Sequence, residues 1–430
     1  MKKGFVISWF FPPINSSEGL VTFKLLKNSK YNHDVFTQKN NKDWTYGNKE
    51  DSLINNNIKN IYGNHESQQV WVQECVDFFR KNSKKYDFIM SRAMPMASHQ
   101  AALGIKKEFP DKFWIASFGD PVAYSPYVMI QGPKKPRKFN PVHLPLVAGV
   151  GIIGILISTK KTVRVLMSRK RRNTYFKEQQ KIKESEQEIL RKADKLIFNN
   201  PYQLEYMLRS FTAEEKNQIK AKSIILPHSF EKSLYQKTKC KQAQKNTKKI
   251  VYLGHLDNIR SPKYLFKALA EMKKTNPSQY KKLSFDFYGT MSDKDRLYIY
   301  DNDLYDIVQI KKPVDYLESL KIMSQSDWCL LIDGDISAVV EENIYFPGKL
   351  ADYLGSGAKI LAISMLKGAS ADIIRKTGNI LSSYCVDDIK MKLIMIADGK
   401  HDDTPKNKGL KEFDAKNVAK LYDEKVVPLK

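Results

Sequence analysis

Short apolar runs alternate with longer amphipathic segments along most of this chain, and this alternation restricts the fold more than any other feature. The runs are too short for helices, and the segments between them have helical lengths. Such a pattern is typical of parallel strands joined by helices in βαβ units. We therefore predict an α/β protein with two doubly wound, Rossmann-like parallel sheets. The runs occupy residues 4–10, 87–92, 113–118, 195–200 and 223–229 in the first half, and 249–255, 283–289, 328–333 and 358–364 in the second.

The chain is long enough for two domains. Its 430 residues exceed what one core usually organises, so we expect two units of about 200 residues each. Residues 231–249 are polar and rich in Lys and Gln, and we interpret them as a linker between domains 1–230 and 250–405. Residues 406–430 are expected to form a helical tail that could pack back on the first domain. Open α/β sheets bind ligands beyond the carboxyl ends of their strands, so the two domains would face each other across a cleft.

The net charge points to an anionic partner. With 72 Lys and Arg against 47 Asp and Glu, the formal charge is +25, which favours nucleic acid, an anionic membrane surface or a phosphorylated substrate. The sequence contains no RRM, KH or helix-turn-helix pattern, and its densest basic cluster flanks an apolar segment instead of alternating with aromatic residues. We therefore expect no nucleic-acid partner.

The apolar segment Leu144–Ile157 breaks the alternation. Its fourteen residues fall short of the about 20 that a spanning helix needs, and it lies in a basic stretch, 134–172, that we interpret as a membrane-associating helical insertion in the first domain. Such a segment fits an anchor that lies in the plane of the membrane or enters and leaves it on the same side. We therefore expect a peripheral or monotopic protein at the cytoplasmic face of the membrane. A buried core helix and a single span are the alternatives. The residues expected at the membrane are Leu144, Val147, Ile152, Ile153, Leu156, Lys160, Lys161, Arg171 and Arg172.

The cysteines and the N-terminus bear on the compartment. Four cysteines lie far apart without a CxxC pair, so neither a zinc site nor a disulfide framework is indicated, and a reducing, cytoplasmic location fits. The first apolar run ends after only a few residues at Pro12 and Pro13, without a small-residue cleavage site. A first buried strand explains it better than a secretion signal.

Two strand-to-helix junctions could approach phosphate groups. The first strand leads through a loop into a helix near Gly19, where backbone amides could point at phosphate oxygens. In the second half, Gly254 ends a strand, and Arg260 stands in the following loop, where a guanidinium could bind a diphosphate. An ordinary turn and an ordinary surface arginine are the alternative interpretations.

The junction at 343–364 is the most informative of the three. Gly348 and Lys349 lie at the expected start of a short helix, whose free N–H groups and positive dipole end would face the cleft. Asp352, one turn later, could accept hydrogen bonds from two ribose hydroxyls. Gly357 permits a tight exit into the next strand.

These junctions belong to a longer pattern that resembles the family-4 glycosyltransferases of the GT-B fold, particularly bacterial members that make surface polysaccharides. The resemblance keeps its order and spacing over nearly the whole chain. It implies transfer of a sugar from a nucleotide donor, usually with retention at the anomeric carbon and without a metal or other cofactor. The segments that carry it are SWFFPPINSSEGL, YDFIMSRAMPMASHQAAL, FWIASFGDPV, RKADKLIFNN, YLGHLDNIRSPKYLFKAL, YLESLKIMSQSDWCLLID and YFPGKLADYLGSGAKILAIS.

The resemblance also implies roles for individual residues. Arg260 and Lys349 would hold the donor diphosphate, Asp352 would bind the ribose, and the Gly19 loop would close over the phosphates. The catalytic candidates His99 and Asp120 would line the acceptor side of the cleft, with a buried core histidine and a helix-capping aspartate as the alternatives. The full implied donor set is Gly19, Gly254, Arg260, Gly348, Lys349 and Asp352.

Two positions depart from the family pattern. Many members carry a sugar-contacting glutamate eight residues before the ribose carboxylate, where this chain has Ile344. Glu341 and Glu342 are nearby but out of register, and they are the weakest donor-sugar candidates. The arginine that often precedes the Asp-Pro pair is here Gly119.

The Asp333-Gly-Asp335 sequence is similar to the metal motif of another glycosyltransferase fold. Because it follows an apolar strand in a chain that matches the metal-independent fold, we interpret it as a loop.

The expected function is transfer of a sugar from a nucleotide-diphosphate donor to a lipid-linked glycan, in capsule, exopolysaccharide or cell-wall polymer synthesis. Two alternatives stay open. A catalytically degenerate GT-B protein could act as a membrane scaffold, and a GT-B enzyme could instead epimerise a sugar nucleotide.

Overall fold

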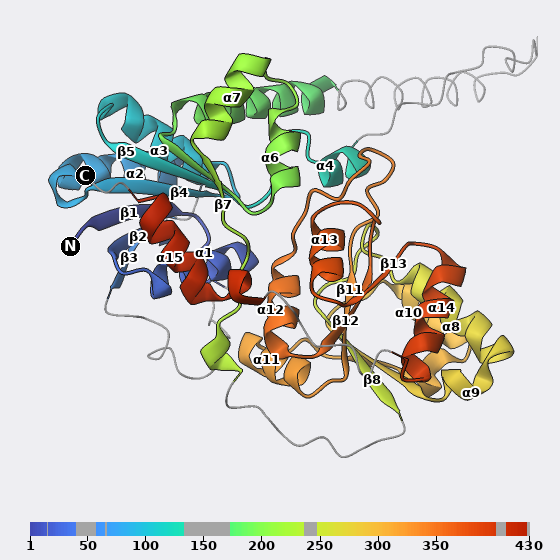
Figure 1. Ribbon diagram of the computed structural model, residues 1–430. Helices are drawn as coiled ribbons and strands as arrows, with labels where there is room; N and C mark the ends of the chain where they lie inside the picture. Colours follow the sequence, from blue (N-terminus) through green and yellow to red (C-terminus); the bar gives the residue numbers. More distant parts are fainter. Residues whose placement is uncertain are drawn as a thin grey trace, which may run out of the picture.

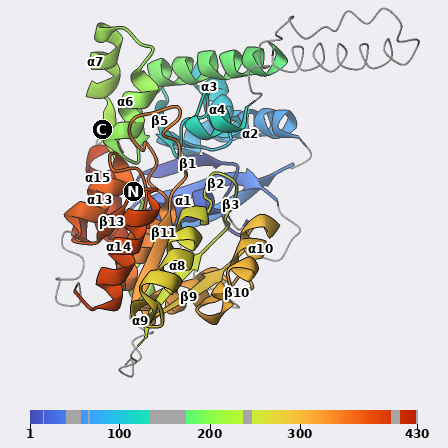
Figure 2. The same ribbon diagram turned by 90° about the vertical axis from the view of Figure 1, so that its right-hand side faces the viewer.

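Two α/β domains make up the computed structural model, and each is built on one parallel sheet (Figure 1). Figure 2 shows the first domain above the second. All nine predicted membrane contacts lie in the basic insertion, outside the described residues. The structure describes residues 1–14, 16–39, 57–64, 67–132, 173–235, 247–400 and 410–427.

The first sheet has seven parallel strands in the order β3-β2-β1-β4-β5-β6-β7. Its order reverses at β1, where Val6 lies between Val35 of β2 and Met90 of β4. Both faces of the sheet are buried, because Phe5 lies in one hydrophobic cluster and Val6 in the other. The strands are β1 Lys3–Ser8, β2 Asn32–Gln38, β3 Ile58–Gly63, β4 Phe88–Ala93, β5 Phe113–Phe118, β6 Lys195–Phe198 and β7 Ser223–Ile225.

The second sheet has six parallel strands in the order β10-β9-β8-β11-β12-β13. Its order reverses at β8, which lies between β9 and β11. The reversals at β1 and β8 are the places where doubly wound sheets bind ligands. The strands are β8 Lys248–Leu253, β9 Leu283–Tyr288, β10 Val308–Lys311, β11 Trp328–Ile332, β12 Lys359–Ile363 and β13 Ile380–Ser382.

The helices cover both faces of each sheet, and local capping fixes several of their starts. Thr212 and Glu215 form a capping box at α7, and the Asp315 side chain accepts the Glu318 amide at α11. In the first domain the helices are α1 Ser17–Asn28, α2 Gln68–Asn82, α3 Ala97–Glu108, α4 Pro126–Gln131, a helix over 173–192, α6 Pro201–Leu208 and α7 Ala213–Ala221. In the second they are α8 Lys263–Thr275, α9 Pro277–Tyr280, α10 Asp293–Asp301, α11 Tyr316–Ser324, α12 Gly348–Ser356, α13 Ala369–Lys376 and α14 Val386–Ala397.

The C-terminal helix α15, Ala415–Lys425, packs on α1 of the first domain (Figure 1). Val418 and Tyr422 share a buried cluster with Phe23 and Leu26. The Ser29 hydroxyl donates to Asp423 Oδ1 over 2.6 Å. The chain therefore crosses between the domains twice, and the two crossings meet where Phe230 pairs with residues 413–415.

The predicted and observed elements agree closely. Each of the nine apolar runs overlaps a strand. The predicted linker ends earlier than expected, because Lys248 and Lys249 already belong to β8. The short 3₁₀ turn Lys232–Leu234 also lies within it.

Candidate active site

A cavity of about 440 Å³ lies between the two domains, at the carboxyl ends of β1, β8 and β9. It therefore sits at the reversal points of both sheets, where such folds bind ligands. Its first-domain wall consists of Pro12, Ile14, Ser16, Ser17, Leu20, Val21 and Lys24. Its second-domain wall includes Gly254, His255, Tyr288, Gly289, Thr290, Pro313, Val314, Tyr316, Gly348, Lys349 and Asp352.

Helix α12 begins at the cavity wall, as predicted from the sequence. Its N-cap residue is Pro347, and no side chain caps its first turn. The helix start at Gly348 and Lys349 therefore presents backbone N–H groups and the positive end of the helix dipole. Gly357 ends the helix in the left-handed conformation with φ of 76°.

Lys349 turns back toward the end of β8. Its Nζ donates to the Tyr252 hydroxyl over 3.0 Å and to the Leu253 carbonyl over 3.1 Å. Gly254 leaves room for it, since a Cβ atom there would lie 2.8 Å from that Nζ. Burial and the charge of Arg260 lower the pKa of Lys349 to about 7. An anion in the cavity would favour the protonated form.

Arg260 acts on Lys349 through its charge and is not among the residues that line the cavity. Its guanidinium carbon is 5.2 Å from the centre of the Tyr127 ring, and its backbone N–H donates to Asp257. This geometry therefore gives no support to the predicted direct contact between Arg260 and a donor diphosphate. The positive charge of Arg260 acts on the site through Lys349 and Asp120.

Asp352 is buried and carries hydrogen bonds from both domains. Its Oδ1 accepts from Lys24 Nζ over 2.7 Å and from the Tyr316 hydroxyl over 2.9 Å. Lys24 also donates to the Ser229 carbonyl over 3.0 Å. Lys24 and Asp352 both line the cavity. The sequence singled out Asp352 but assigned no role to Lys24 or Tyr316.

Gly289 brings the β8 and β9 loops together at the cavity wall. Its φ is 143°, and a Cβ atom there would lie 2.8 Å from the Gly254 carbonyl carbon. Only glycine fits this close approach. Pro313 and Val314 line the second-domain wall together with these loops.

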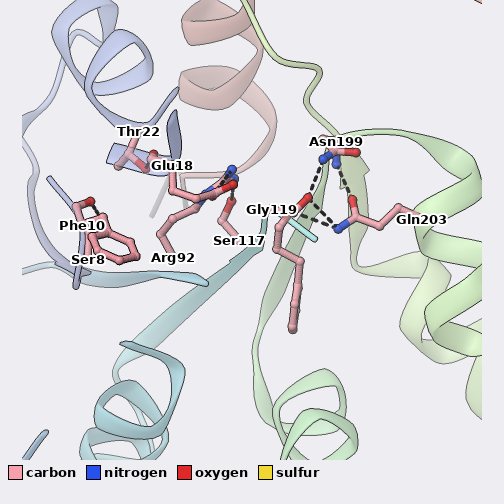
Figure 3. Close-up of polar contacts among 10 residues, drawn as sticks. Ser8, Phe10, Glu18, Thr22, Arg92, Ser117, Gly119, Asn199 and Gln203 are labelled. Atoms are coloured by element: carbon pink, nitrogen blue, oxygen red, sulfur yellow. Dashed lines mark hydrogen bonds and ion pairs between the residues drawn. The ribbon is translucent and has the colours of Figure 1, made fainter. Parts of the chain in front are cut away.

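Asp120 follows β5 and stands where charges from both domains meet. Burial and the nearby carboxylate of Glu18 raise its pKa to about 7, against the opposing effect of Arg92 and Arg260. Figure 3 shows the Glu18 and Arg92 side chains beside Gly119, directly before Asp120. The sequence predicted Asp120 in the cleft, but Asp120 is not among the residues that line this cavity. The sequence missed Glu18 and Arg92.

The structure corrects the prediction for His99. This residue is fully buried on the inward face of α3, its Nδ1 lies 2.7 Å from the Ser91 hydroxyl, and its ring centre lies 4.5 Å from that of Phe118. Burial lowers its pKa to about 3. His99 is therefore a core histidine and does not line the cleft. Ala102 and Leu103, three and four residues further along α3 and therefore on the same face, are buried as well.

Three further candidates also lie away from the cavity. Gly19 packs on the preceding loop, since a Cβ atom there would be 3.1 Å from the Phe10 carbonyl carbon and from Phe11 Cα. Its role is to seat α1, while its neighbour Ser17 reaches the cavity. Glu341 and Glu342 are both exposed and outside the cavity wall.

The Asp-Gly-Asp segment after β11 is held by protein contacts. Asp333 is buried and accepts from Asn343 Nδ2 over 2.9 Å and from the Ser364 hydroxyl over 2.8 Å. Among the described residues, no group of three or more His, Cys, Asp or Glu side chains is placed to hold a metal ion. In the same part of the chain, no helix combines the length and the apolar character that crossing a bilayer requires.

Neither a family model nor a curated protein matches this chain, but solved structures share its fold. The apo lipopolysaccharide outer core galactosyltransferase WaaB is 13% identical and covers 99% of both chains with a TM-score of 0.59. Sucrose-phosphate synthase from Thermosynechococcus elongatus is 14% identical, with a TM-score of 0.58 over 98% of this chain and 94% of that one. UDP-GlcNAc 2-epimerase from Methanocaldococcus jannaschii is 12% identical, with a TM-score of 0.51 over 98% of each chain. These likenesses confirm the predicted GT-B fold, and at such identities they show the fold alone.

Proposed function

We propose that this protein is a glycosyltransferase that moves a sugar from a nucleoside-diphosphate donor to an acceptor hydroxyl. The observation that carries the proposal is the cavity between the two domains, which combines an uncapped helix start, a half-buried lysine and a carboxylate in one wall. A nucleoside diphosphate has the matching parts: two phosphates, two ribose hydroxyls and a flat base.

The start of α12 and Lys349 are the proposed diphosphate ligands. Backbone N–H groups at a helix N-terminus bind phosphate oxygens, and the dipole favours negative charge there. Lys349 would leave its contacts with Tyr252 and Leu253, gain its proton and pair with the phosphates. Arg260 would support this site through its positive charge, without a direct contact to the diphosphate.

Asp352 is the proposed ribose ligand. A buried carboxylate can accept hydrogen bonds from both ribose hydroxyls. The Oδ1 atom already accepts from Lys24 and Tyr316, so the ribose would use Oδ2 or displace one of these donors. The apolar wall at Pro313 and Val314 would then cover one face of the base.

Two parts of the proposal concern the acceptor. Asp120 is the proposed hydrogen-bond partner of the acceptor hydroxyl, in a retaining reaction that needs no metal. A lipid-linked glycan is the proposed acceptor, because the basic and apolar insertion would hold the protein at the cytoplasmic face of an anionic membrane. Deletion of residues 144–157 should release the protein from membranes, and continued binding after the deletion would place the anchor elsewhere.

An epimerase that acts on a sugar nucleotide is the second candidate, since the UDP-GlcNAc 2-epimerase structure shares this fold. The two functions differ in their products. An epimerase converts the sugar nucleotide without any acceptor, whereas a transferase needs an acceptor to release the nucleotide efficiently. Incubation of the bound sugar nucleotide alone, followed by proton NMR of the sugar, separates them.

The first experiment is a calorimetric titration of the purified protein with UDP, GDP, ADP and CMP and their common sugar derivatives, with and without EDTA. We expect one nucleoside diphosphate to bind, and its affinity to survive the chelator. Binding that EDTA abolishes would contradict the metal-independent site. Failure of every nucleotide to bind would reject the proposed function and favour a degenerate scaffold.

A further inference from the structure

A carboxylate from α1 lies over the backbone that leads to Asp120. Glu18 is in the first turn of α1, and a Cβ atom on Gly119 would lie 2.8 Å from its carboxyl carbon. Any larger residue at position 119 would therefore collide with Glu18. Glycine at this position makes room for the carboxylate next to Asp120.

Arg92 at the end of β4 fixes that carboxylate in place. Its guanidinium is buried, its Nε donates to Glu18 Oε2 over 2.9 Å, and its Nη1 donates to the Ser117 hydroxyl over 2.9 Å (Figure 3). The Nη2 atom lies 2.8 Å from the same Glu18 oxygen. A buried guanidinium with these partners cannot easily swing away, so Glu18 stays beside Gly119.

The backbone of Gly119 is held from the opposite side. Its carbonyl oxygen accepts from Asn199 Nδ2 over 2.5 Å and from Gln203 Nε2 over 3.1 Å (Figure 3). Asn200 meanwhile donates to the Ile344 carbonyl of the second domain over 2.9 Å. The position of Asp120 is thus tied to β6, α6 and the segment before α12.

The groups that face Asp120 come from both domains. In the first domain these groups are the negatively charged Glu18 of α1 and the positively charged Arg92 of β4. From the second domain, the positive charge of Arg260 also acts on Asp120. Asp120 also acts electrostatically on the phenols of Tyr127 in α4 and Tyr345 before α12, whose rings stack 4.3 Å apart. Asp120 therefore lies where charged groups of both domains act on it.

We propose that Glu18 is a positioning residue: held by Arg92 over Gly119, it keeps a fixed negative charge beside Asp120, which favours the protonated form of Asp120 and lets that carboxyl both donate to and accept from a substrate hydroxyl. The role of this pair toward the acceptor rests on the glycosyltransferase function proposed above. The placement of Glu18 over Gly119 follows from the geometry of the nucleotide-free protein.

The burial of Asp120 and the charge of Glu18 act in the same direction. Both oppose ionisation of Asp120 and raise its pKa to about 7, while Arg92 and Arg260 limit the effect. Removing the Glu18 charge should therefore lower the pKa of Asp120.

The direct test measures the Asp120 carboxyl in protein labelled with ¹³C at aspartate side chains, with Asp120→Asn to identify its signal. In Glu18→Gln the titration midpoint of Asp120 should fall by about one pH unit or more. Glu18→Asp keeps the charge and should retain most of the raised midpoint. Glu214→Gln, which removes an exposed carboxylate at the start of α7, should leave the midpoint unchanged. A midpoint in Glu18→Gln equal to that of the wild type would overturn the proposal.

The functional test uses the pH dependence of transfer once a donor and an acceptor are known. The rising limb of kcat should move to lower pH in Glu18→Gln by the same amount as the NMR midpoint, with nucleotide affinity unchanged. A uniform loss of kcat at every pH would show a merely structural role for Glu18. If the wild type binds no nucleotide, the proposed glycosyltransferase function is rejected. The NMR result on Glu18 and Asp120 is still valid, because it needs no substrate.

Discussion

Lys24 and Asp352 form a buried ion pair that joins the two domains, with 2.7 Å between Nζ and Oδ1. Lys24 comes from α1 of the first domain and Asp352 from α12 of the second. Tyr316 donates to the same oxygen, and the lysine also donates to a backbone carbonyl. The proposed ribose ligand thus also contributes to the contact between the domains.

Breaking this pair should destabilise the protein. Lys24→Met leaves the Asp352 carboxylate buried without its cation, and such a loss typically costs about 3–5 kcal/mol. We expect the Tm in scanning calorimetry to fall by roughly 5–10 °C. Lys420→Met removes a cation from the exposed pair with Glu424 and should change the Tm little. Equal effects of the two substitutions would mean that the Lys24 pair is solvated.

Removal of the Lys349 amine should weaken nucleotide binding. Lys349→Ala deletes one charged hydrogen-bond donor to the diphosphate, worth roughly 1.5–3 kcal/mol, or about ten- to a hundredfold in Kd. Calorimetry near pH 6.5, where the lysine of the wild type is largely charged, measures the change. The exposed Lys367→Ala of the same domain is the matched control. An unchanged Kd in Lys349→Ala would remove the diphosphate assignment.

Nucleotide binding should also take up a proton at alkaline pH. Burial and Arg260 lower the pKa of Lys349 to about 7 in the free protein, so this amine is mostly neutral at pH 8. A bound diphosphate favours the charged form and raises the pKa, and affinity should therefore fall as the pH rises above 7. Calorimetry at pH 8 in two buffers with different ionisation enthalpies gives the number of protons. Lys349→Met should reduce that number, and the same uptake in both proteins would contradict the role of the amine.

The two glycines at the cavity and at the end of α12 should respond differently to alanine. At Gly289 a Cβ atom would collide with the backbone of Gly254, whereas at Gly357 it would meet nothing within 4 Å. Gly357→Ala should therefore cost only the left-handed backbone strain of about 1 kcal/mol. Gly289→Ala should lower the Tm further and weaken nucleotide binding by moving the β8 and β9 loops apart. If both variants bind nucleotide as the wild type does, these loops do not form the site.

The buried ring of His228 should make the fold sensitive to acid. Neither of its nitrogens has a partner among the described residues, and burial with the charges of Arg92 and Lys24 lowers its pKa to about 3. The unfolded chain then binds more protons than the folded protein below pH 6.5, and up to about 1.4 kcal/mol is lost per pH unit below it. His228→Phe removes this pH-dependent loss of folding stability. The Tm of the wild type should fall relative to His228→Phe between pH 7 and pH 5, and parallel Tm curves would contradict the burial of a neutral ring.

The sequence predicted strands with two buried faces where they are continuous apolar runs, such as Trp328–Ile332. It missed β3, β10 and β13, which lie at the sheet edges and carry polar residues. It also missed β2, where His33 and Asp34 interrupt the apolar pattern although both are buried. Local composition cannot reveal burial that neighbouring elements create.

The candidate site was predicted only in part, and for the same reason. Gly348, Lys349 and Asp352 belong to one local loop-to-helix pattern, so their grouping could be inferred from the sequence. Lys24 contacts Asp352 across 328 positions of the chain, a relationship that no spacing rule encodes. Glu18 gave a weak signal as an acid in a first helical turn, which normally indicates only dipole stabilisation.

The packing of α15 on α1 has a consequence for how the protein is made. The ribosome completes β1 to β7 first, then the whole second domain, and only afterwards the helix whose Val418 and Tyr422 fill the core beside Phe23. Until then, an apolar face of the first domain stays open to solvent or to a chaperone, although domains usually fold in the order of their synthesis. The second domain can therefore finish folding while the first still waits for its last helix.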